Sequence, residues 1–214
     1  LHKTVRRQRQ MCIRDRFGEE YTLVACADYV LQSEKGALVS NLSSSRALAD
    51  LANDCGVDYH ASAVGEVHVV AKMKEVNAVI GGEGNGGVIL PALHYGRDAL
   101  VGIALFLSHL AKEKISVSAL KARYASYVMD KKKIELSPSW DADALLAAVA
   151  KTFADARVTT IDGVKIDFVD SWIHLRKSNT EPIIRLYGEA KTQEKMADKI
   201  NTIEAAIAAF VAST

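Results

Sequence analysis

The sequence predicts an α/β protein with two parts: a βαβ three-layer domain with a mixed or parallel sheet, followed by a small α+β domain with a mainly antiparallel sheet. In the first part, short apolar runs alternate with longer stretches of helical periodicity, which is the pattern of parallel βαβ units. In the second part, strand-like runs are joined by connections of hairpin length. With 214 residues, 49% of them hydrophobic, the chain is long enough for one large core or two modest ones.

The first part begins at Phe17 and alternates helix and strand patterns. The hydroxyls of Ser43–Ser45 are placed to cap a helix that Gly56 then ends, and Ser116 or Ser118 is placed to cap the last helix. The expected elements, in order, are a helix over 21–36, a strand over 37–41, a helix over 46–54, a strand over 57–61, a helix over 66–76, a strand over 78–80, an apolar helix over 97–112 and a helix ending near 127.

The sequence changes character near residues 128–138, where three lysines and a Ser-Pro-Ser run interrupt the periodic pattern. We place the junction in this stretch, so that the first domain covers 17–130 and the second covers 131–214. Asp141 is placed to cap the first helix of the second domain. The expected elements are a helix over 141–154, strands over 157–161, 164–169, 172–176 and 183–187, and a helix over 193–210.

Residues 1–16 are set apart by their charge. They contain six of the 27 basic residues but one of the 26 acidic ones, without helical or strand periodicity. Basic arms bind nucleic acid or anionic membranes in some proteins, but this one has no interleaved aromatic residue and ends abruptly at Phe17. The string resembles a translated sequencing adapter, so we interpret it as a non-native tail. The rest of the chain is mildly acidic, which argues against nucleic acid as a partner.

Cysteine content and hydropathy indicate a cytoplasmic protein without a membrane partner. Cys12, Cys26 and Cys55 are odd in number and lack metal-like spacing, so we expect no disulfide framework. No apolar run approaches the roughly 18–20 residues of a membrane span, and the N-terminus lacks the apolar core of a signal peptide.

A loop rich in hydrogen-bond donors lies between two predicted strands of the second domain. It runs from Arg176 to Pro182 with the sequence RKSNTEP, and Arg185 follows it. Arginine binds a phosphate group through two parallel hydrogen bonds, while hydroxyl and backbone N–H groups bind the remaining oxygens. The alternative is an ordinary hairpin turn with solvated charges. The candidate phosphate ligands are Arg176, Ser178, Asn179, Thr180 and Arg185.

A second candidate loop follows the third strand of the first domain and has five glycines among its seven residues, Gly81 to Gly87. Its spacing differs from that of dinucleotide-binding loops. Glu83 is able to accept hydrogen bonds from two adjacent sugar hydroxyls, and Asn85 both donates and accepts. Because five glycines are costly in entropy for a simple connection, the composition favours a binding loop over a plain turn.

Together the two loops resemble those of the α-D-phosphohexomutases, the family of phosphoglucomutases, phosphomannomutases and phosphoglucosamine mutases. Gly82–Gly87 resembles the family's sugar-specificity loop, usually Gly-Glu-x-Ser-Gly-His. Arg176–Pro182 resembles its distal phosphate loop, usually Arg-x-Ser-Gly-Thr-Glu-Pro. The order of the loops and the predicted domain types match the third and fourth domains of the family, over residues 17–214.

The resemblance implies the C-terminal half of an isomerase that moves a phosphoryl group within a hexose phosphate, by way of a hexose 1,6-bisphosphate. It implies that Glu83 and Asn85 bind sugar hydroxyls, while the loop at 176–182 and Arg185 bind the phosphate that is not reacting. The family's phosphorylated serine and its Mg²⁺-binding Asp-x-Asp-x-Asp loop belong to the missing N-terminal domains, and neither motif occurs here. The pair Asp141 and Asp143 is interpreted as a helix cap, so no Mg²⁺ ligand is expected in this chain.

We therefore expect the chain to bind hexose phosphate weakly and to catalyse nothing without those domains, and no catalytic residue is assigned. Within the family, the sequence Asn85-Gly86-Gly87 resembles that of phosphoglucosamine mutase-like members. The alternative is a non-enzymatic phosphosugar-binding module.

Five features near the predicted site depart from the family pattern or leave a role open. Asn179 replaces a glycine, although asparagine tolerates a left-handed backbone. Gly87 replaces a histidine, and Ser43 replaces a lysine found in several relatives. Glu66 occupies a substrate-side position, and His94, Tyr95 and Arg97, just after the sugar loop in sequence, are candidates to line the cleft. For Ser43 and Glu66, a role at a helix terminus is the alternative.

Overall fold

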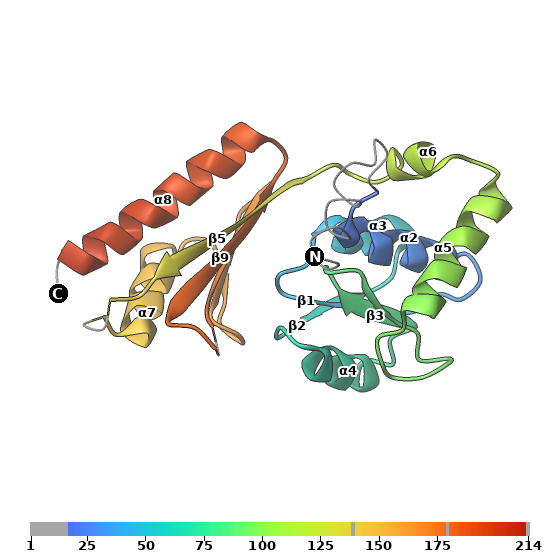
Figure 1. The fold of residues 1–214 in the computed structure, drawn as a ribbon, viewed down its shortest axis with the longest axis horizontal. Helices are drawn as coiled ribbons and strands as arrows, with labels where there is room; N and C mark the ends of the chain where they lie inside the picture. The colour runs from blue at the N-terminus through green and yellow to red at the C-terminus, as the bar shows by residue number, and fades with distance from the viewer. Residues whose placement is uncertain (1–16, 138–139, 179, 213–214) are drawn as a thin grey trace, which may run out of the picture.

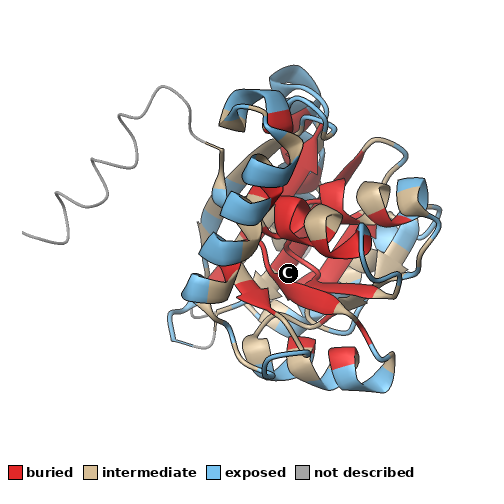
Figure 2. Ribbon diagram, turned by 90° about the vertical axis from the view of Figure 1, so that its right-hand side faces the viewer, coloured by how far each residue is buried: buried red, intermediate tan, exposed pale blue. Residues whose placement is uncertain are grey.

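The computed structural model describes residues 17–137, 140–178 and 180–212, which form two domains side by side (Figure 1). Each domain has its own sheet. The strand order is β2-β1-β3-β4 in the first sheet and β5-β9-β8-β7-β6 in the second. Buried residues gather in the strands and on the inner faces of the helices (Figure 2). The predicted fold class, a βαβ three-layer domain followed by a small antiparallel α+β domain, is confirmed.

The first domain has three layers, because its central parallel strands are buried on both faces and need cover on each side. β1, β2 and β3 are parallel, and β4 runs antiparallel to β3. α2, α3 and α5 pack in one hydrophobic cluster, and α4 covers the other face (Figure 1). The bounds are α2 Glu19–Leu31, β1 Leu38–Asn41, α3 Ala47–Cys55, β2 Tyr59–Ser62, α4 Glu66–Glu75, β3 Ile80–Glu83, β4 Gly87–Ile89, α5 Ala99–Glu113 and α6 Val117–Lys121.

Serine hydroxyls were predicted to cap two helices of this domain. Ser116 caps α6 by accepting a hydrogen bond from the backbone N–H of Ala119. The N-cap position of α3 falls on Arg46, which makes no side-chain cap, and of the three predicted serines only Ser45 supplies a hydroxyl to this end of the helix. Ser45 lies one residue further out and accepts from the N–H of Ala47, and Ser43 is used for a contact between the domains.

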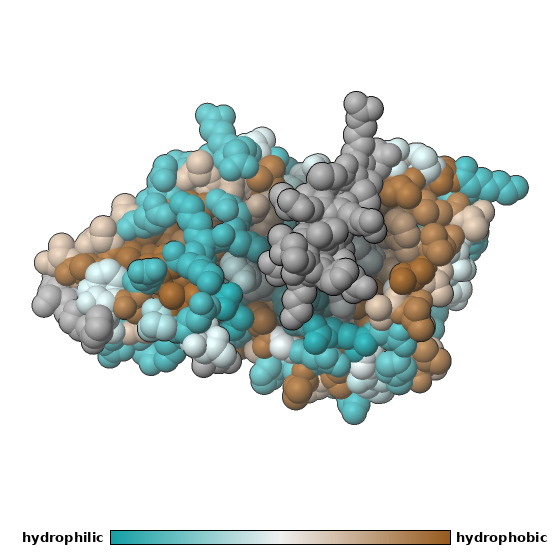
Figure 3. Space-filling view, in the orientation of Figure 1, coloured by the Kyte–Doolittle hydropathy of each residue, from teal (hydrophilic) through white to brown (hydrophobic). Residues whose placement is uncertain are grey.

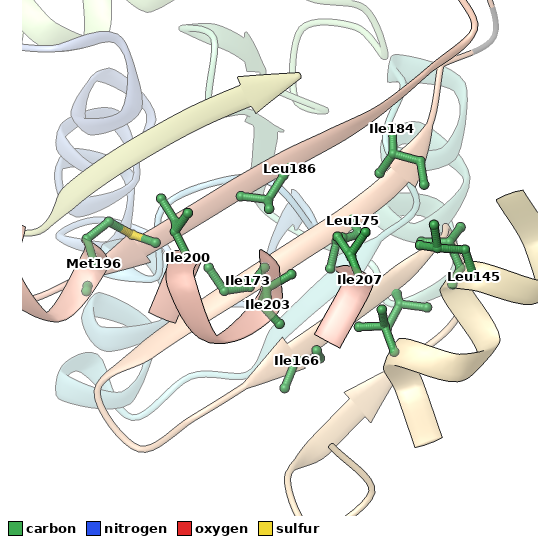
Figure 4. Packing of buried hydrophobic residues seen from close by; sticks show 14 residues of the cluster. Leu145, Ile166, Ile173, Leu175, Ile184, Leu186, Met196, Ile200, Ile203 and Ile207 are labelled. Carbon is green, nitrogen blue, oxygen red and sulfur yellow. The ribbon is translucent and has the colours of Figure 1, made fainter. Parts of the chain in front are cut away.

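The second domain is an antiparallel sheet with α7 and α8 on one face (Figure 1). Strand β8 shows how the sequence selects these faces, because successive side chains point to opposite sides of a sheet. Ile173 and Leu175 lie in the core beneath the helices (Figure 4). Trp172, His174 and Arg176 lie on the opposite face. The bounds are β5 Val128–Glu135, α7 Ala142–Thr152, β6 Arg157–Thr159, β7 Val164–Asp167, β8 Ser171–Lys177, β9 Ile183–Ala190 and α8 Gln193–Ala212.

Two parts of the sequence form strands that the sequence patterns did not predict. Residues 128–135, which we interpreted as a connection, form β5 and pair with β9 along its whole length. The glycine-rich loop is a β-hairpin, in which Glu83 ends β3 opposite Gly87 of β4. The last helix of the first domain, α6, ends at Lys121 rather than near 127.

None of the helices in the described part of the chain is long and apolar enough to cross a membrane. Helix α5 nevertheless has an exposed apolar face, formed by Leu100, Ile103 and Leu107 (Figure 3). The proposed non-native tail, residues 1–16, lies outside the described residues.

Candidate functional site

The candidate site lies where the carboxyl ends of β1, β2 and β3 meet the second sheet. The carboxyl edge of a parallel sheet is the usual place for a ligand in α/β domains. Here, Asn41 at the end of β1 donates from Nδ2 to Oε1 of Glu83 at the end of β3, over 3.0 Å. After β2, the N–H of Val64 donates to Oδ2 of Asp162 in the second domain, over 2.9 Å. Loops from both domains therefore converge on this edge.

Glu83 is buried, and both of its carboxylate oxygens are engaged. Oε1 accepts from Asn41, and Oε2 accepts from Nη1 of Arg97 over 3.0 Å. Each carboxylate oxygen has two lone-pair positions, so each retains one acceptor position beyond these contacts. Glu83 is thus held in a fixed orientation with two neighbouring acceptor positions.

Asn85 stabilises the turn of its own hairpin. Its side chain is exposed, and Oδ1 accepts from the N–H of Gly87 over 3.1 Å, which stabilises the turn of the hairpin. The amide nitrogen of Asn85 makes no hydrogen bond among the described residues and is able to donate to a ligand. Glu83 and Asn85 therefore share one hairpin, with Glu83 at its base and Asn85 at its tip.

Arg97 joins the hairpin to the start of α4. Its Nε donates to Oε2 of Glu66 over 2.7 Å, and its backbone N–H donates to Oε1 of the same carboxylate over 3.2 Å. These hydrogen bonds hold the pKa of Glu66 below its usual value. Gly87 leaves the space that Arg97 occupies, because a Cβ at position 87 would lie 2.6 Å from Cδ of Arg97.

The predicted phosphate loop follows β8 and returns into β9. Arg176 and Arg185 are direct cross-strand partners, although like charges at such positions destabilise a sheet. Nη2 of Arg185 donates to Oε2 of Glu181 over 3.0 Å and to Oγ of Ser178 over 3.4 Å. Within the described residues, the buried Nε of Arg176 has no hydrogen-bond partner. The N–H of Thr180 donates to Oγ of Ser178, and Asn179 lies outside the described residues.

A third cation extends this pair across the sheet. Lys133 of β5 is the register partner of Arg185 on its other side, and its Nζ lies 3.2 Å from Oε1 of Glu181. Three cations from three neighbouring strands thus form a row, and one carboxylate contacts two of them. Lys133 was not among the predicted ligands, because the sequence pattern of β5 resembles a connection.

A short relay of hydrogen bonds connects the two loops, which have no direct hydrogen bond or ion pair between them in the described part of the chain. From Glu83 it passes to Asn41, whose Oδ1 accepts from the N–H of Ser43 over 3.0 Å. Oγ of Ser43 lies 2.8 Å from Nδ1 of His174. His174 and Arg176 lie on the same face of β8, so the relay ends beside the phosphate loop.

His174 is buried at this junction in its neutral form. Its Nε2 lies 2.6 Å from the carbonyl oxygen of Asp162, so Nε2 carries the proton and Nδ1 accepts from Ser43. Burial lowers the pKa of His174 to about 4. The alternation of apolar and polar residues along β8 places His174 on the same face as Arg176, and this is the signal in the sequence that points to it.

Two buried carboxyl groups hold the N-terminus of α3. Glu189 accepts from the N–H of Arg46 and from the indole N–H of Trp172, both over 2.9 Å, and burial raises its pKa. Glu20 accepts from the N–H of Ser45 over 3.2 Å. Burial raises the pKa of Glu20 to about 7, although Lys131 opposes the shift. These contacts fix the loop after β1 between the two domains.

Stability should depend on pH through His174. The unfolded chain takes up a proton at an ordinary histidine pKa near 6.5, whereas the folded chain takes it up only near 4. The stabilisation is therefore complete above pH 6.5 and declines as pH falls toward 4, by about 3 kcal/mol. The raised pKa of Glu20 acts in the opposite direction, because protonation of this carboxyl favours the folded state between pH 7 and 4.5.

The difference in unfolding free energy between the unmodified chain and His174→Gln isolates this effect, since Glu20 is common to both. Urea unfolding at a series of pH values should show that the unfolding free energy of the unmodified chain, minus that of His174→Gln, becomes smaller as the pH falls from 6.5 to 4. A difference that stays constant over this range would show that His174 titrates normally.

The described residues include no group of three or more His, Cys, Asp or Glu side chains that could hold a metal ion. Asp141 caps α7 by accepting from the N–H groups of Asp143 and Ala144, as the sequence predicts for this pair. The residues described here thus do not fit a Mg²⁺ site, and no chemical step is assigned to the ion.

The chain is a two-domain α/β protein: a three-layer domain is joined to an antiparallel domain, and loops that carry polar and charged side chains meet at the junction. Sequence models of two phosphoglucomutase/phosphomannomutase domains match it: alpha/beta/alpha domain III over residues 18–127 and the C-terminal domain over residues 126–206. The chain belongs to the phosphoglucomutase/phosphomannomutase family, as the resemblance indicated.

Relatives in archaea and bacteria agree with this assignment. A phosphoglucomutase/phosphomannomutase of Thermococcus kodakarensis is 37% identical over 81% of this chain and 38% of its own length. A phosphoglucosamine/phosphogalactosamine mutase of Sulfurisphaera tokodaii is 33% identical over 78% of this chain and 37% of its own length. The crystal structure of a family protein from Burkholderia thailandensis matches 89% of this chain and 41% of its own, with 26% identity and a TM-score of 0.75. The chain thus spans about two fifths of the length of these relatives.

Proposed function

We propose that this chain is the C-terminal half of a phosphohexomutase and supplies its sugar and distal phosphate sites. The hairpin residues Glu83 and Asn85 bind sugar hydroxyls. The loop after β8 anchors the phosphate that is not reacting. Its proposed ligands are Arg176, Ser178, Asn179, Thr180 and Arg185.

The observation that carries this proposal is the state of Arg176. A buried N–H without a partner is costly, and a cation opposite another cation adds repulsion. A bound phosphate removes both costs at once, because its oxygens accept from the two guanidinium groups. Local conflicts of this kind are typical of functional sites.

The geometry of Glu83 supports the sugar site. Its two remaining acceptor positions are adjacent and fixed by Asn41 and Arg97. Two hydroxyls on neighbouring ring carbons present two donors at a similar separation. A hydroxyl beside a protonated amine does the same, which suits hexosamine phosphates. Phosphoglucosamine is the proposed substrate, because phosphoglucosamine mutases are among the relatives.

Phosphoryl transfer depends mainly on positioning and electrostatic stabilisation. In this proposal the chain's residues bind and orient the hexose phosphate, whichever end is reacting. The phosphorylated serine and Mg²⁺ belong to the other domains. A related N-acetylphosphoglucosamine mutase of Aspergillus fumigatus has been crystallised with glucose 1,6-bisphosphate, and another structure of that enzyme contains magnesium.

The test combines a binding and an activity measurement on the 214-residue chain. Calorimetric titration with glucose 1,6-bisphosphate and with glucosamine 6-phosphate should detect weak binding, while a coupled mutase assay should detect no turnover. Turnover by the chain alone would contradict its role as a half-enzyme. Binding of neither ligand would contradict the proposed function itself.

A further inference from the structure

Arg97 was outside the predicted set of ligands, but its contacts make it the link between the sugar hairpin and α4. It donates to Glu83 through Nη1 and to Glu66 through Nε and the backbone N–H. Two carboxylates share this one guanidinium. Glu66 and Arg97, together with Asn85, Gly86 and Gly87, line a surface depression of about 560 Å³, and Arg97 reaches from it to the buried carboxylate of Glu83.

The absence of a side chain at position 87 permits this arrangement. Gly87 is the register partner of Glu83, and Arg97 lies against its Cα, where a Cβ would be 2.6 Å from Cδ and 3.2 Å from Cγ of Arg97. The carbon chain of Arg97 thus occupies the volume that any other residue at 87 would need. By packing against Gly87, the side chain of Arg97 brings its guanidinium within hydrogen-bond distance of Glu83.

We propose that Arg97 is a positioning residue that determines how the sugar site binds its substrate. It fixes the carboxylate of Glu83 so that one acceptor position on each oxygen faces a pair of neighbouring ring substituents. The ligand class is a hexose phosphate with two adjacent donors, either two hydroxyls or a hydroxyl and an ammonium group. The inference rests on the proposed function and assigns it a residue that acts through Glu83.

The ion pair with Arg97 also stabilises the charged, buried carboxylate of Glu83. Glu83 is buried whereas Arg97 is half-exposed, so removing Arg97 leaves a buried carboxylate without its opposite charge, which is costly. Without Arg97, the carboxylate would keep its bond to Asn41 but would rotate or recruit water to replace the lost donor. Either response changes the direction of its free acceptor positions.

The test compares four forms of the 214-residue chain: unmodified, Arg97→Ala, Gly87→Ala, and the two substitutions combined. Arg123→Ala is the matched control, because Arg123 is as exposed as Arg97, at 43% each, and forms an ion pair with Glu113. The ligands are glucose 1,6-bisphosphate and inorganic phosphate. Both are titrated by calorimetry, and the Glu83 carboxyl ¹³C resonance is followed by NMR without ligand.

Arg97→Ala should weaken glucose 1,6-bisphosphate binding by about tenfold and leave inorganic phosphate binding unchanged. Gly87→Ala should have a similar effect because it displaces Arg97, and the combined variant should be no worse than Arg97→Ala alone, since both substitutions act on one contact. The Glu83 resonance should move in all three variants but not in Arg123→Ala.

Equal affinities of Arg97→Ala and the unmodified chain for glucose 1,6-bisphosphate would overturn the inference and leave the phosphate loop's role intact. Equal losses for both ligands would also overturn it, because the effect would not pass through the sugar. If the unmodified chain binds neither ligand, the proposed function fails and this inference fails with it.

Discussion

Replacing Arg176 by alanine should weaken binding of glucose 1,6-bisphosphate to this chain on the order of 10- to 100-fold. The reason is the loss of charge-assisted hydrogen bonds from a guanidinium whose Nε is buried and has no partner within the described chain. The same substitution should not destabilise the fold strongly, because it also removes the repulsion between Arg176 and Arg185. Calorimetry and urea unfolding measure the two effects separately.

Lys177→Ala provides the matched control. Lys177 is the next residue of β8, so its side chain points to the opposite face, where Nζ lies 2.7 Å from Asp143. Lys177→Ala removes the same unit of charge without removing any of the five predicted phosphate ligands. Similar losses for Arg176→Ala and Lys177→Ala would show that general charge, rather than a specific anchor, governs binding.

Replacing Gly82 by alanine should lower the unfolding free energy by about 2–3 kcal/mol and abolish recognition of the sugar. A Cβ at this position would overlap the carbonyl oxygen of Gly87 on the facing strand and would lie 3.2 Å from Cδ1 of Leu23. Because the obstacle is backbone, the hairpin has to open to relieve it. Glu83, the next residue, would then lose its register with Gly87.

Gly102→Ala is the control for this substitution. Gly102 lies inside α5, where a Cβ would meet Val88 at an ordinary contact distance of 3.4 Å. Alanine is favoured over glycine within a helix, so this variant should be stabilised by about 0.5–1 kcal/mol. Thermal or urea unfolding distinguishes the two outcomes. Unchanged stability of Gly82→Ala would show that the hairpin tolerates a side chain and does not hold Glu83 as described.

The fold was predictable because the local patterns agree with the tertiary structure over most of the chain. Strand β5 was missed for a physical reason. It is the edge strand of its sheet, it is only partly buried, and its lysines are the charges that commonly protect an edge from pairing with another chain. A strand of this kind has no apolar run, so its place is set by pairing with β9.

The candidate site was predictable only in its local components. Arg176, Arg185 and Glu83 became candidates because each stands in or beside a stretch of unusual composition at the end of a strand. Arg97 and His174 act through partners distant in sequence: His174 contacts Ser43 across 131 positions. Ser43 contacts His174 instead of capping a helix because the fold brings the two residues together, and a local sequence pattern cannot predict this.

The most direct test of the account is an NMR titration of the 214-residue chain with glucose 1,6-bisphosphate. The backbone amides of Ser178 and Thr180 report on the phosphate loop, and those of Glu83 and Gly84 report on the sugar hairpin. The account predicts that both groups shift and that their titration curves give one common dissociation constant. Shifts confined to one loop, or no shift in either, would contradict the claim that the two loops form a single site for one hexose phosphate.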